Sequence, residues 1–317
     1  MKIIRHIIGG HQLWKRMLLL IGGLFLLFVA LNFLFPLKVD IEFAPLVEAR
    51  DGTVVHAYLN SQDKWRMYLE VEEITPEIKR AFLYKEDRYY YRHFGINPLA
   101  LTRAIFNNVV KGKRTSGAST ITMQVARLLK PKPRTYTNKM VEMFRALQLE
   151  WKFSKEEILQ LYFNLVPYGG NIEGVKAASF LYFEKSPELL SLAELTSLAV
   201  IPNRPNSLTP GRHNHKIKAV RDQWLRRFQQ ANIFPDADIQ DALEEPLTAQ
   251  RNAAPQYAPH FSYRVTYNNS RALIKTTLDW SLQQKVEALV RNYVSKIYHR
   301  NIKNAAVVVL DNQDNQV

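Results

Sequence analysis

The chain has 317 residues, of which 47% are apolar and 11% aromatic. This length and composition describe a globular protein that buries a sizeable core and has room for one membrane element. The formal charge of +14 favours anionic partners, namely nucleic acid, an acidic membrane surface or a phosphorylated substrate. The absence of cysteine excludes disulfides, a thiolate nucleophile and a zinc–thiolate site.

Residues 17–37 form an uncharged stretch rich in Leu and Phe. Its length matches a hydrocarbon core of about 30 Å, so it is predicted to span the bilayer as a single-pass anchor. The basic residues Lys2, Arg5, Lys15 and Arg16 precede it, and the positive-inside rule keeps residues 1–16 in the cytoplasm and exports everything after Lys38. A cleaved signal peptide is the alternative, but the stretch exceeds the usual apolar core of such peptides and lacks a clear cleavage site.

Two structural classes follow along the chain. Residues 38–74 are predicted to hold a small β element, because β-branched residues flank Asp51-Gly52, a hairpin-turn dipeptide. Over residues 75–246, apolar positions recur at three- and four-residue steps between short Pro, Gly or Asn breaks. This pattern predicts a mainly α domain.

The C-terminal part contains a predicted linker and a new unit. Residues 247–270 have two prolines and no helical stripe, which is typical of a linker. Residues 271–317 start another domain, with a strand and a helix predicted over 274–290 and a strand entering a turn over 305–317.

An acid pair, Glu86-Asp87, opens the stretch EDRYYYRHFGIN, and the hydroxyl-rich stretch GASTITMQ (117–124) follows it. A carboxylate supplies a general base for a sugar hydroxyl, whereas Ser119, Thr120 and the free N–H groups of a helix N-terminus can hold an anionic leaving group. The combination indicates sugar chemistry on a phosphate-linked donor. The alternative for the acid pair alone is a solvated helix end.

A helix starting near Ser119 places Thr120, Gln124 and Arg127 on one face at i, i+4 and i+7. Arg127 can then reach a diphosphate seated by the two hydroxyls. The alternative is an ordinary amphipathic helix with Ser119 as its N-cap, which does not explain why Gln and Arg share the face of the cap.

Two further helices are predicted. The first, over 138–152, carries Lys139 and Glu142 at i and i+3, which alone could be a surface ion pair. The second starts at a capping box over 154–157 and ends near Asn164. Beyond it, Gly174 either permits close approach to a glycan or simply punctuates a helix.

Together with TNKMVE (137–142), ILQLYFNLVPYGGNIEGVKAA (158–178) and ELTSLAVIPNRPNSLTP (194–210), these stretches reproduce in order the five motifs of the family 51 peptidoglycan glycosyltransferases. The chain resembles a class A penicillin-binding protein from about residue 39 onward, and KWRMY (64–68) and YAPHF (257–261) are most similar to the 1C branch. The resemblance implies a lysozyme-like glycosyltransferase domain over 75–246 and an incomplete transpeptidase domain over 271–317.

The resemblance also implies a reaction, the polymerisation of lipid II into β-1,4 glycan strands with release of undecaprenyl diphosphate. Glu86 would be the general base and Glu142 a second catalytic residue, while His93 would shape the Glu86 loop. The substrate contacts implied are Asp87, Tyr90, His93, Ser119, Thr120, Gln124, Arg127, Lys139, Asn164 and Tyr168. A divalent cation, Mg²⁺ or Mn²⁺, is an expectation from the family, with no metal ligand assigned. The implied partners are lipid II, the growing glycan strand, inner-membrane lipids and other cell-wall synthesis proteins, and no nucleic acid is expected.

The chain departs from the family pattern in three places. Asn138 stands where the family has an Arg, so Arg134 and Arg145 are candidate substitutes for the missing cation. Pro167 stands where the family often has a Tyr. The only Ser-x-x-Lys is at residues 61–64, upstream of the glycosyltransferase motifs, so no transpeptidase activity is expected from this chain.

Two rival functions remain open. A lysozyme-like hydrolase or lyase would use a similar carboxylate to cleave glycan, and a catalytically silent scaffold would recruit cell-wall enzymes. The resemblance also implies that the domain dips into the membrane, and residues 98–110 are apolar enough to do so beside Lys111, Lys113 and Arg114. A core helix is the alternative for that segment.

Overall fold

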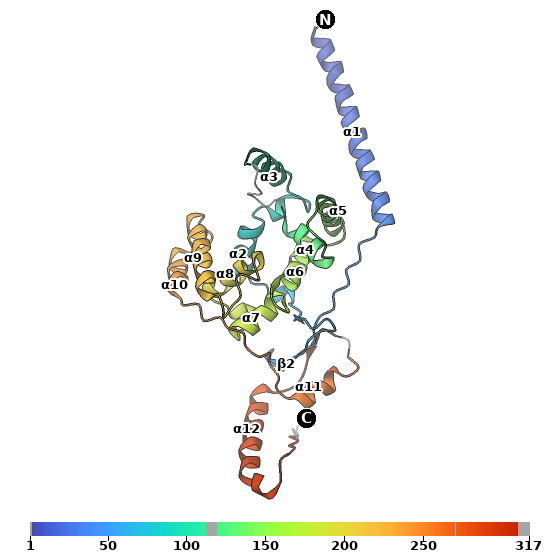
Figure 1. The fold of residues 1–317 in the computed structure, drawn as a ribbon. Helices are drawn as coiled ribbons and strands as arrows, with labels where there is room; N and C mark the ends of the chain where they lie inside the picture. The colour runs from blue at the N-terminus through green and yellow to red at the C-terminus, as the bar shows by residue number, and fades with distance from the viewer. Residues whose placement is uncertain (1, 112–118, 270, 310–317) are drawn as a thin grey trace. The chain divides into compact units, whose positions relative to one another are not determined.

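The computed structural model describes residues 2–111, 119–269 and 271–309, which are mainly helical (Figure 1). The chain divides into two compact units. The first contains Met1–Ile41 and Glu86–Leu159, and the second contains Glu42–Lys85 and Gln160–Val317. Lys113 and Arg114, predicted to lie beside the membrane-dipping segment 98–110, fall outside the described residues.

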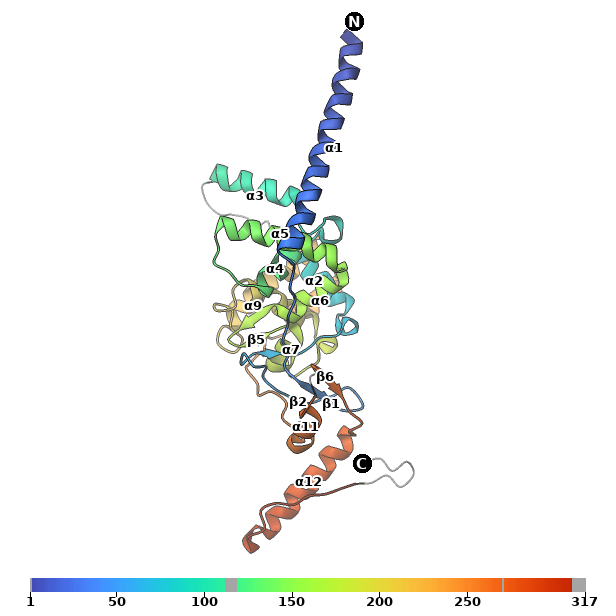
Figure 2. The same cartoon turned by 90° about the vertical axis from the view of Figure 1, so that its right-hand side faces the viewer.

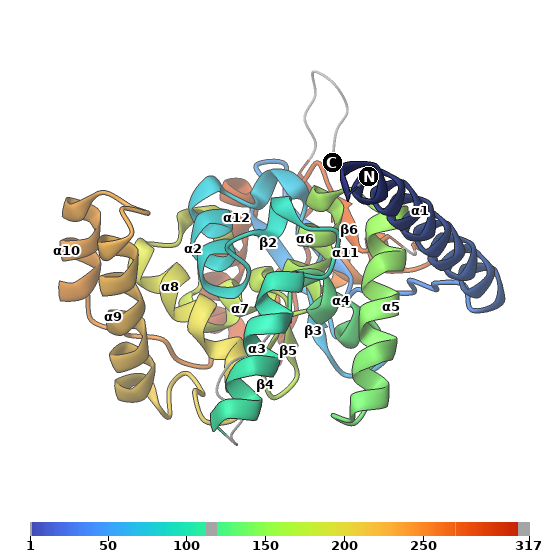
Figure 3. The same ribbon diagram turned by 90° about the horizontal axis from the view of Figure 1, so that it is seen from above.

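The first unit consists of helices. They are α1 (Lys2–Leu34), the 3-10 turn η2 (Tyr90–Arg92), α3 (Pro98–Lys111), α4 (Ile121–Leu129) and α5 (Tyr136–Lys152). Helix α2 (Pro76–Glu86) enters the unit at its last residue, and α6 (Lys155–Leu165) begins in it. Figure 2 shows α1 reaching α5, and Figure 3 shows α5 beside α4.

Helix α1 contains an apolar span, Trp14–Leu34, with a mean hydropathy of 2.6. By length and composition it is the one helix in the described part of the chain that could cross a membrane. The helix ends at Leu34, three residues before the end of the predicted span 17–37. Pro36 explains the difference, because the residue before a proline is disfavoured in the α conformation.

The second unit contains two small sheets. The predicted hairpin is confirmed, since β1 (Leu46–Glu48) pairs antiparallel with β2 (Val54–Ala57). Strand β6 (Leu273–Lys275) then pairs parallel with β1, so the strand predicted for the C-terminal unit completes the N-terminal β element. The other sheet has the order β3 (Trp65–Arg66), β5 (Ile172–Glu173), β4 (Pro167–Gly169).

The rest of the second unit is mainly helical. It contains α7 (Val175–Phe183), α8 (Leu192–Val200), α9 (Asn214–Gln230), α10 (Asp236–Glu244), α11 (Pro259–Thr266) and α12 (Trp280–Ile297). The described residues of this unit also contain the 3-10 turns η1 (Val71–Glu73), η3 (Pro187–Leu189), η4 (Ile201–Asn203) and η5 (Tyr298–Arg300).

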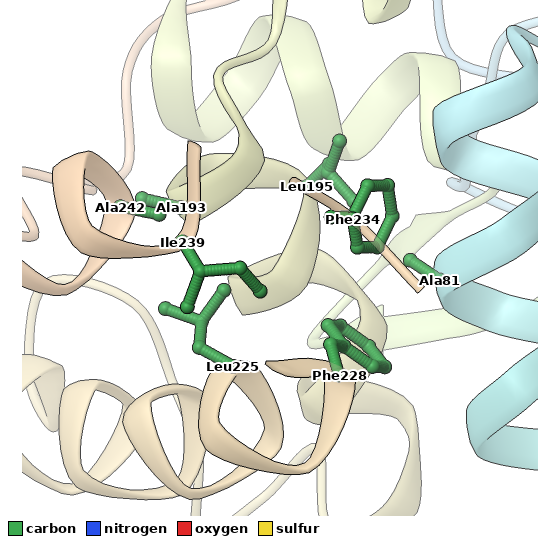
Figure 4. Close-up of a cluster of buried hydrophobic side chains, with 8 residues drawn as sticks. All are labelled: Ala81, Ala193, Leu195, Leu225, Phe228, Phe234, Ile239 and Ala242. Carbon is green, nitrogen blue, oxygen red and sulfur yellow. The ribbon is translucent and has the colours of Figure 1, made fainter. Parts of the chain in front are cut away.

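A core cluster joins α2, α8, α9 and α10 within this unit (Figure 4). Phe228 packs its ring 5.4 Å from that of Phe234 and 5.7 Å from that of Tyr84. The buried members are Ala81, Ala193, Leu195, Leu225, Phe228, Phe234, Ile239 and Ala242. This cluster holds α2, and α2 carries Glu86 at its C-terminal end.

Two predictions about the C-terminal part were wrong. Residues 247–270 contain α11, whose Phe261 and Val265 lie one helical turn apart and pack against the β hairpin. Pro at the first position of this helix favours its start. The strand predicted over 305–317 is absent from residues 305–309, and the rest of that segment lies outside the described residues.

Lys176 on α7 is a buried cation, 2% exposed, that pairs with Glu48 at 3.1 Å and Glu73 at 2.7 Å. Lys176→Met is expected to lower the free energy of unfolding by about 3–5 kcal/mol, because it leaves two carboxylates without their cation. Chemical denaturation measures this loss. Lys185→Met removes the more exposed Lys185–Glu194 pair and is expected to cost less than about 1 kcal/mol. An equal loss in both variants would contradict the prediction.

Candidate active site

Glu86 is the last residue of α2 and is partly buried. Gln124 on α4 donates from Nε2 to Glu86 Oε2 at 3.0 Å. Pro76 starts α2 and the loop with η2 follows it, so the helix delivers the carboxylate at a fixed point. The structure thus brings two predicted site residues, 38 positions apart, into direct contact.

Asp87 and His93 form a buried pair. His93 Nε2 lies 3.0 Å from each carboxylate oxygen of Asp87, and Asp87 Oδ2 also accepts the backbone N–H of Ile121 at 3.0 Å. Both oxygens are therefore used inside the protein. The pair ties the Glu86 loop to the first residue of α4, which agrees with the expectation that His93 shapes this loop. Direct contact of either residue with substrate stays a prediction.

Thr120 caps helix α4. Its hydroxyl oxygen accepts the Met123 N–H at 3.1 Å and donates to the Gly95 carbonyl at 2.6 Å. The N-cap is therefore Thr120, not Ser119. Because the N–H groups of Ile121 and Met123 are both occupied, this N-terminus offers fewer free donors to an anion than the sequence suggested.

The cationic part of the site lies between α4 and α5. Lys139 Nζ donates to Ser119 Oγ at 2.6 Å and to Glu142 Oε2 at 2.8 Å. One ammonium thus joins the hydroxyl-rich stretch to the predicted second carboxylate. This geometry offers a phosphate a positive charge and a hydroxyl donor together.

The arginines predicted to contact phosphate differ in their surroundings. Arg127 on α4 is partly buried, and no hydrogen bond or ion pair joins it to another described residue. Arg134 is exposed ahead of α5. Arg145 donates from Nη1 to the carbonyls of Phe35 and Pro36 at 2.9 and 3.0 Å. Nη1 of Arg145 is therefore engaged at the end of α1, whereas no hydrogen bond or ion pair joins Arg134 to another described residue. Replacement by Arg134 of the cation absent at Asn138 stays a prediction.

Tyr90 is 1% exposed and donates its hydroxyl to the Lys155 carbonyl at 2.7 Å. Burial raises the pKa of Tyr90. A sugar contact by Tyr90 stays a prediction.

Glu150 is a residue that the sequence did not single out. It accepts hydrogen bonds from Thr122 Oγ1 at 2.6 Å and from Lys155 Nζ at 2.7 Å. The bond from Thr122 joins α4 to α5, and no local sequence signal pairs these two residues.

Gly95 has a φ of +76°, and an added Cβ would lie 2.9 Å from Glu150 Cγ and 3.0 Å from the Ala146 carbonyl oxygen. Gly95→Ala is therefore expected to lower the free energy of unfolding by about 1–3 kcal/mol, measured by chemical denaturation. Gly170→Ala is the matched control, because Gly170 has a φ of +56° but open space around it. Equal losses would show that strain alone, not the clash with α5, limits this position.

Asn164 and Tyr168 belong to the second unit. Asn164 accepts the Leu69 N–H at 2.8 Å and donates to the carbonyls of Leu69 and Gln160 at 3.1 and 3.0 Å. Tyr168 is fully buried. At Gly174, an added Cβ would lie 2.8 Å from the Asn164 carbonyl oxygen, so close packing of the chain on itself explains this glycine. Glycan contact by Asn164 or Tyr168 stays a prediction.

The carboxylates do not gather into a metal centre. No cluster of three or more His, Asp or Glu side chains occurs in residues 2–111, 119–269 and 271–309. Asp87 is bonded to His93 and Ile121, and Glu142 is bonded to Lys139. These described residues do not form a divalent-cation site of their own.

A family model described as Transglycosylase matches residues 51–229. Penicillin-binding protein 1C of Escherichia coli K12 is 37% identical over 297 residues, which cover 92% of this chain and 38% of that protein. Penicillin-binding protein 4 of Bacillus subtilis is 31% identical over 62% of this chain and 32% of its own length. Penicillin-binding protein 1A of Escherichia coli K12 is 31% identical over 78% of this chain and 30% of its own length.

The chain thus spans well under half the length of these curated relatives. A solved penicillin-binding protein 1A of Haemophilus influenzae matches over 87% of this chain and 34% of that one, with a TM-score of 0.38 and 18% identity. The family model, by contrast, covers more than half of the chain and the whole of the Glu86 and Lys139 clusters. This protein therefore belongs to the transglycosylase family and is a homologue of the class A penicillin-binding proteins.

Proposed function

We propose that this protein is a peptidoglycan glycosyltransferase that polymerises lipid II into β-1,4 glycan strands. The observation that carries the proposal is the convergence in one unit of a carboxylate held by an amide, Glu86 with Gln124, and an ammonium held by a hydroxyl and a carboxylate, Lys139 with Ser119 and Glu142. The family match over residues 51–229 supports the same reaction class.

The reaction joins an acceptor sugar to a diphosphate-linked donor. The acceptor 4-hydroxyl attacks the anomeric carbon of the donor while Glu86 takes the hydroxyl proton. The bond between that carbon and the diphosphate oxygen breaks, so the configuration inverts and undecaprenyl diphosphate leaves with both bonding electrons. Gln124 keeps one oxygen of Glu86 hydrogen-bonded and so limits the directions in which the carboxylate can turn.

The departing diphosphate needs positive charge and donors that are already in place. Lys139 and Ser119 supply an ammonium and a hydroxyl, and Arg127 supplies a guanidinium without a partner among the described residues. Glu142 keeps the Lys139 side chain in place before the diphosphate binds. Glu142 would therefore be the second carboxylate that assists the reaction, and it would act by positioning Lys139 through this ion pair.

The membrane assignment fits a lipid-linked substrate. The apolar span Trp14–Leu34 would anchor the protein in the inner membrane, and Lys15 and Arg16 at its start would keep the N-terminus in the cytoplasm. The catalytic residues would then face the periplasmic or extracytoplasmic side, where a lipid-linked sugar donor can be reached from the membrane surface.

The deciding experiment supplies the purified protein with radiolabelled lipid II in detergent. Polymer of increasing length, with release of undecaprenyl diphosphate, is the expected result. Shortening of added glycan without consumption of lipid II would support the hydrolase or lyase instead. If lipid II and glycan both stay unchanged while the protein is folded, the scaffold interpretation replaces the enzyme.

A further inference from the structure

Helix α5 closes the C-terminal end of α1 within the first unit. Arg145 donates to the carbonyls of Phe35 and Pro36, and Gln148, 1% exposed, donates to the Phe35 carbonyl at 2.9 Å and to Asn32 Oδ1 at 2.7 Å. Phe35 and Pro36 directly follow Leu34, the last residue of α1, so these donor side chains hold the chain where it leaves the helix.

Aromatic contacts reinforce the same junction. The Phe28 ring lies 5.9 Å from that of Phe144 and 6.1 Å from that of Trp151, and Phe25 also contacts Trp151 at 6.1 Å. Polar and aromatic contacts together make the junction of α1 and α5 a built interface (Figure 2).

A cavity of about 430 Å³ opens at this junction. We call it the anchor-exit pocket. It is lined by Leu34 to Lys38, by the end of α4 with Lys130 and Lys132, and by one face of α5 from Asn138 to Arg145. Pockets of several hundred Å³ accommodate small organic ligands.

The lining of the pocket is amphipathic. Its cations are Lys38, Lys130, Lys132 and Arg145, and its one carboxylate, Glu142, is already paired with Lys139. The three lysines have no ion-pair partner among the described residues, and no described residue accepts a hydrogen bond from Nε or Nη2 of Arg145. The rest of the lining is mostly apolar: Leu34, Phe35, Pro36, Leu37, Ala126, Leu129 and Val141.

We propose that the anchor-exit pocket binds the phosphate headgroup of an anionic membrane phospholipid. Leu34 is the last residue of the apolar span, so the pocket would lie at the depth of the headgroups once α1 crosses the bilayer. Cations held beside apolar surface at this depth match a lipid phosphate next to its acyl chains. The headgroup meets Arg145, Lys130 and Lys132, and the chains follow Leu34 and Leu37.

The pocket differs from the place proposed for the donor diphosphate. Ser119, Gln124, Arg127 and Lys139 do not line it, and Glu142 is the one proposed catalytic residue that does. A bound phospholipid would join α1 to the helix that carries Lys139 and Glu142. The proposal rests on α1 spanning the membrane and does not depend on glycosyl transfer.

The test measures lipid retention by native mass spectrometry of the full chain, released from mixed micelles of dioleoyl phosphatidylglycerol and dioleoyl phosphatidylcholine in equal amounts. We expect preferential retention of one phosphatidylglycerol. Lys130→Gln/Lys132→Gln should lower that preference roughly tenfold or more, because the pocket loses two of the cations that line it. The control Arg92→Gln/Lys152→Gln removes the same charge from exposed positions of the same unit outside the pocket and should leave the preference unchanged.

A second variant, Val141→Phe, fills the pocket without changing its charge and should also abolish retention, with circular dichroism confirming that α5 is intact. Equal retention of the two lipids, or equal losses in the Lys130/Lys132 and control pairs, would overturn the proposal. Competition with undecaprenyl diphosphate shows whether the pocket binds a phospholipid phosphate or the diphosphate of the substrate lipid. If it displaces phosphatidylglycerol at equimolar concentration and Lys139→Ala also abolishes retention, the pocket belongs to the substrate site and the phospholipid proposal is wrong.

Discussion

Glu86→Gln is expected to lower the rate of lipid II polymerisation by about 10²–10⁴-fold, to or near background, because the amide keeps the shape of the side chain but cannot accept the proton of the acceptor hydroxyl. The carboxylate that this substitution removes is the one that accepts the hydrogen bond from Gln124. Initial rates with labelled lipid II measure the effect, and circular dichroism and membrane insertion confirm that the variant is folded.

Glu77→Gln is the matched control, because Glu77 is an acidic residue of the same helix that pairs with Arg80 at the surface. This variant should polymerise at the rate of the unmodified protein. Wild-type polymerisation by Glu86→Gln would remove Glu86 from the mechanism, whatever the control does.

Lys139→Ala should reduce turnover and binding of the diphosphate lipid by about ten- to a hundredfold. The reason is that one charge-assisted contact contributes about 1.5–3 kcal/mol. The substitution also leaves Ser119 and Glu142 without the ammonium that joins them. Turnover at limiting lipid II and equilibrium binding of undecaprenyl diphosphate measure the two effects.

Lys152→Ala is the control for this variant, because Lys152 is an exposed cation at the other end of α5. Arg127→Ala is expected to show a defect of the same kind as Lys139→Ala. Arg134→Ala tests whether that cation replaces the one absent at Asn138, whereas Arg145→Ala should weaken the junction with α1. Normal turnover in Lys139→Ala, Arg127→Ala, Arg134→Ala and Arg145→Ala alike would contradict the assignment of the diphosphate to this cluster and favour the hydrolase or scaffold.

Local signals in the sequence were sufficient for several elements. The capping box of Ser154 and Glu157 at the start of α6 is confirmed in the structure. The spacing of Lys139 and Glu142 on α5 predicted their contact, since residues three apart on a helix are neighbours. The order of the five motifs indicated the family, which the match over residues 51–229 confirms.

Sequence patterns were weaker where a helix or strand depends on a distant partner. The linker prediction failed at α11, because Phe261 and Val265 form too short a stripe to signal a helix until they pack on the β hairpin. Strand β6 pairs with β1 more than two hundred residues earlier, a partner that no local pattern can identify.

The sequence by itself determined which chemical groups the candidate site contains: the carboxylates of Glu86 and Glu142, the ammonium of Lys139 and the hydroxyl of Ser119. Only the tertiary structure decided which polar groups are already committed inside the protein. Asp87 is committed to His93 and Ile121, Thr120 to Met123 and Gly95, and Arg145 to the end of α1. The physical reason is that a buried polar group must find a hydrogen-bond partner, and its partner is set by packing between segments that lie far apart in the chain.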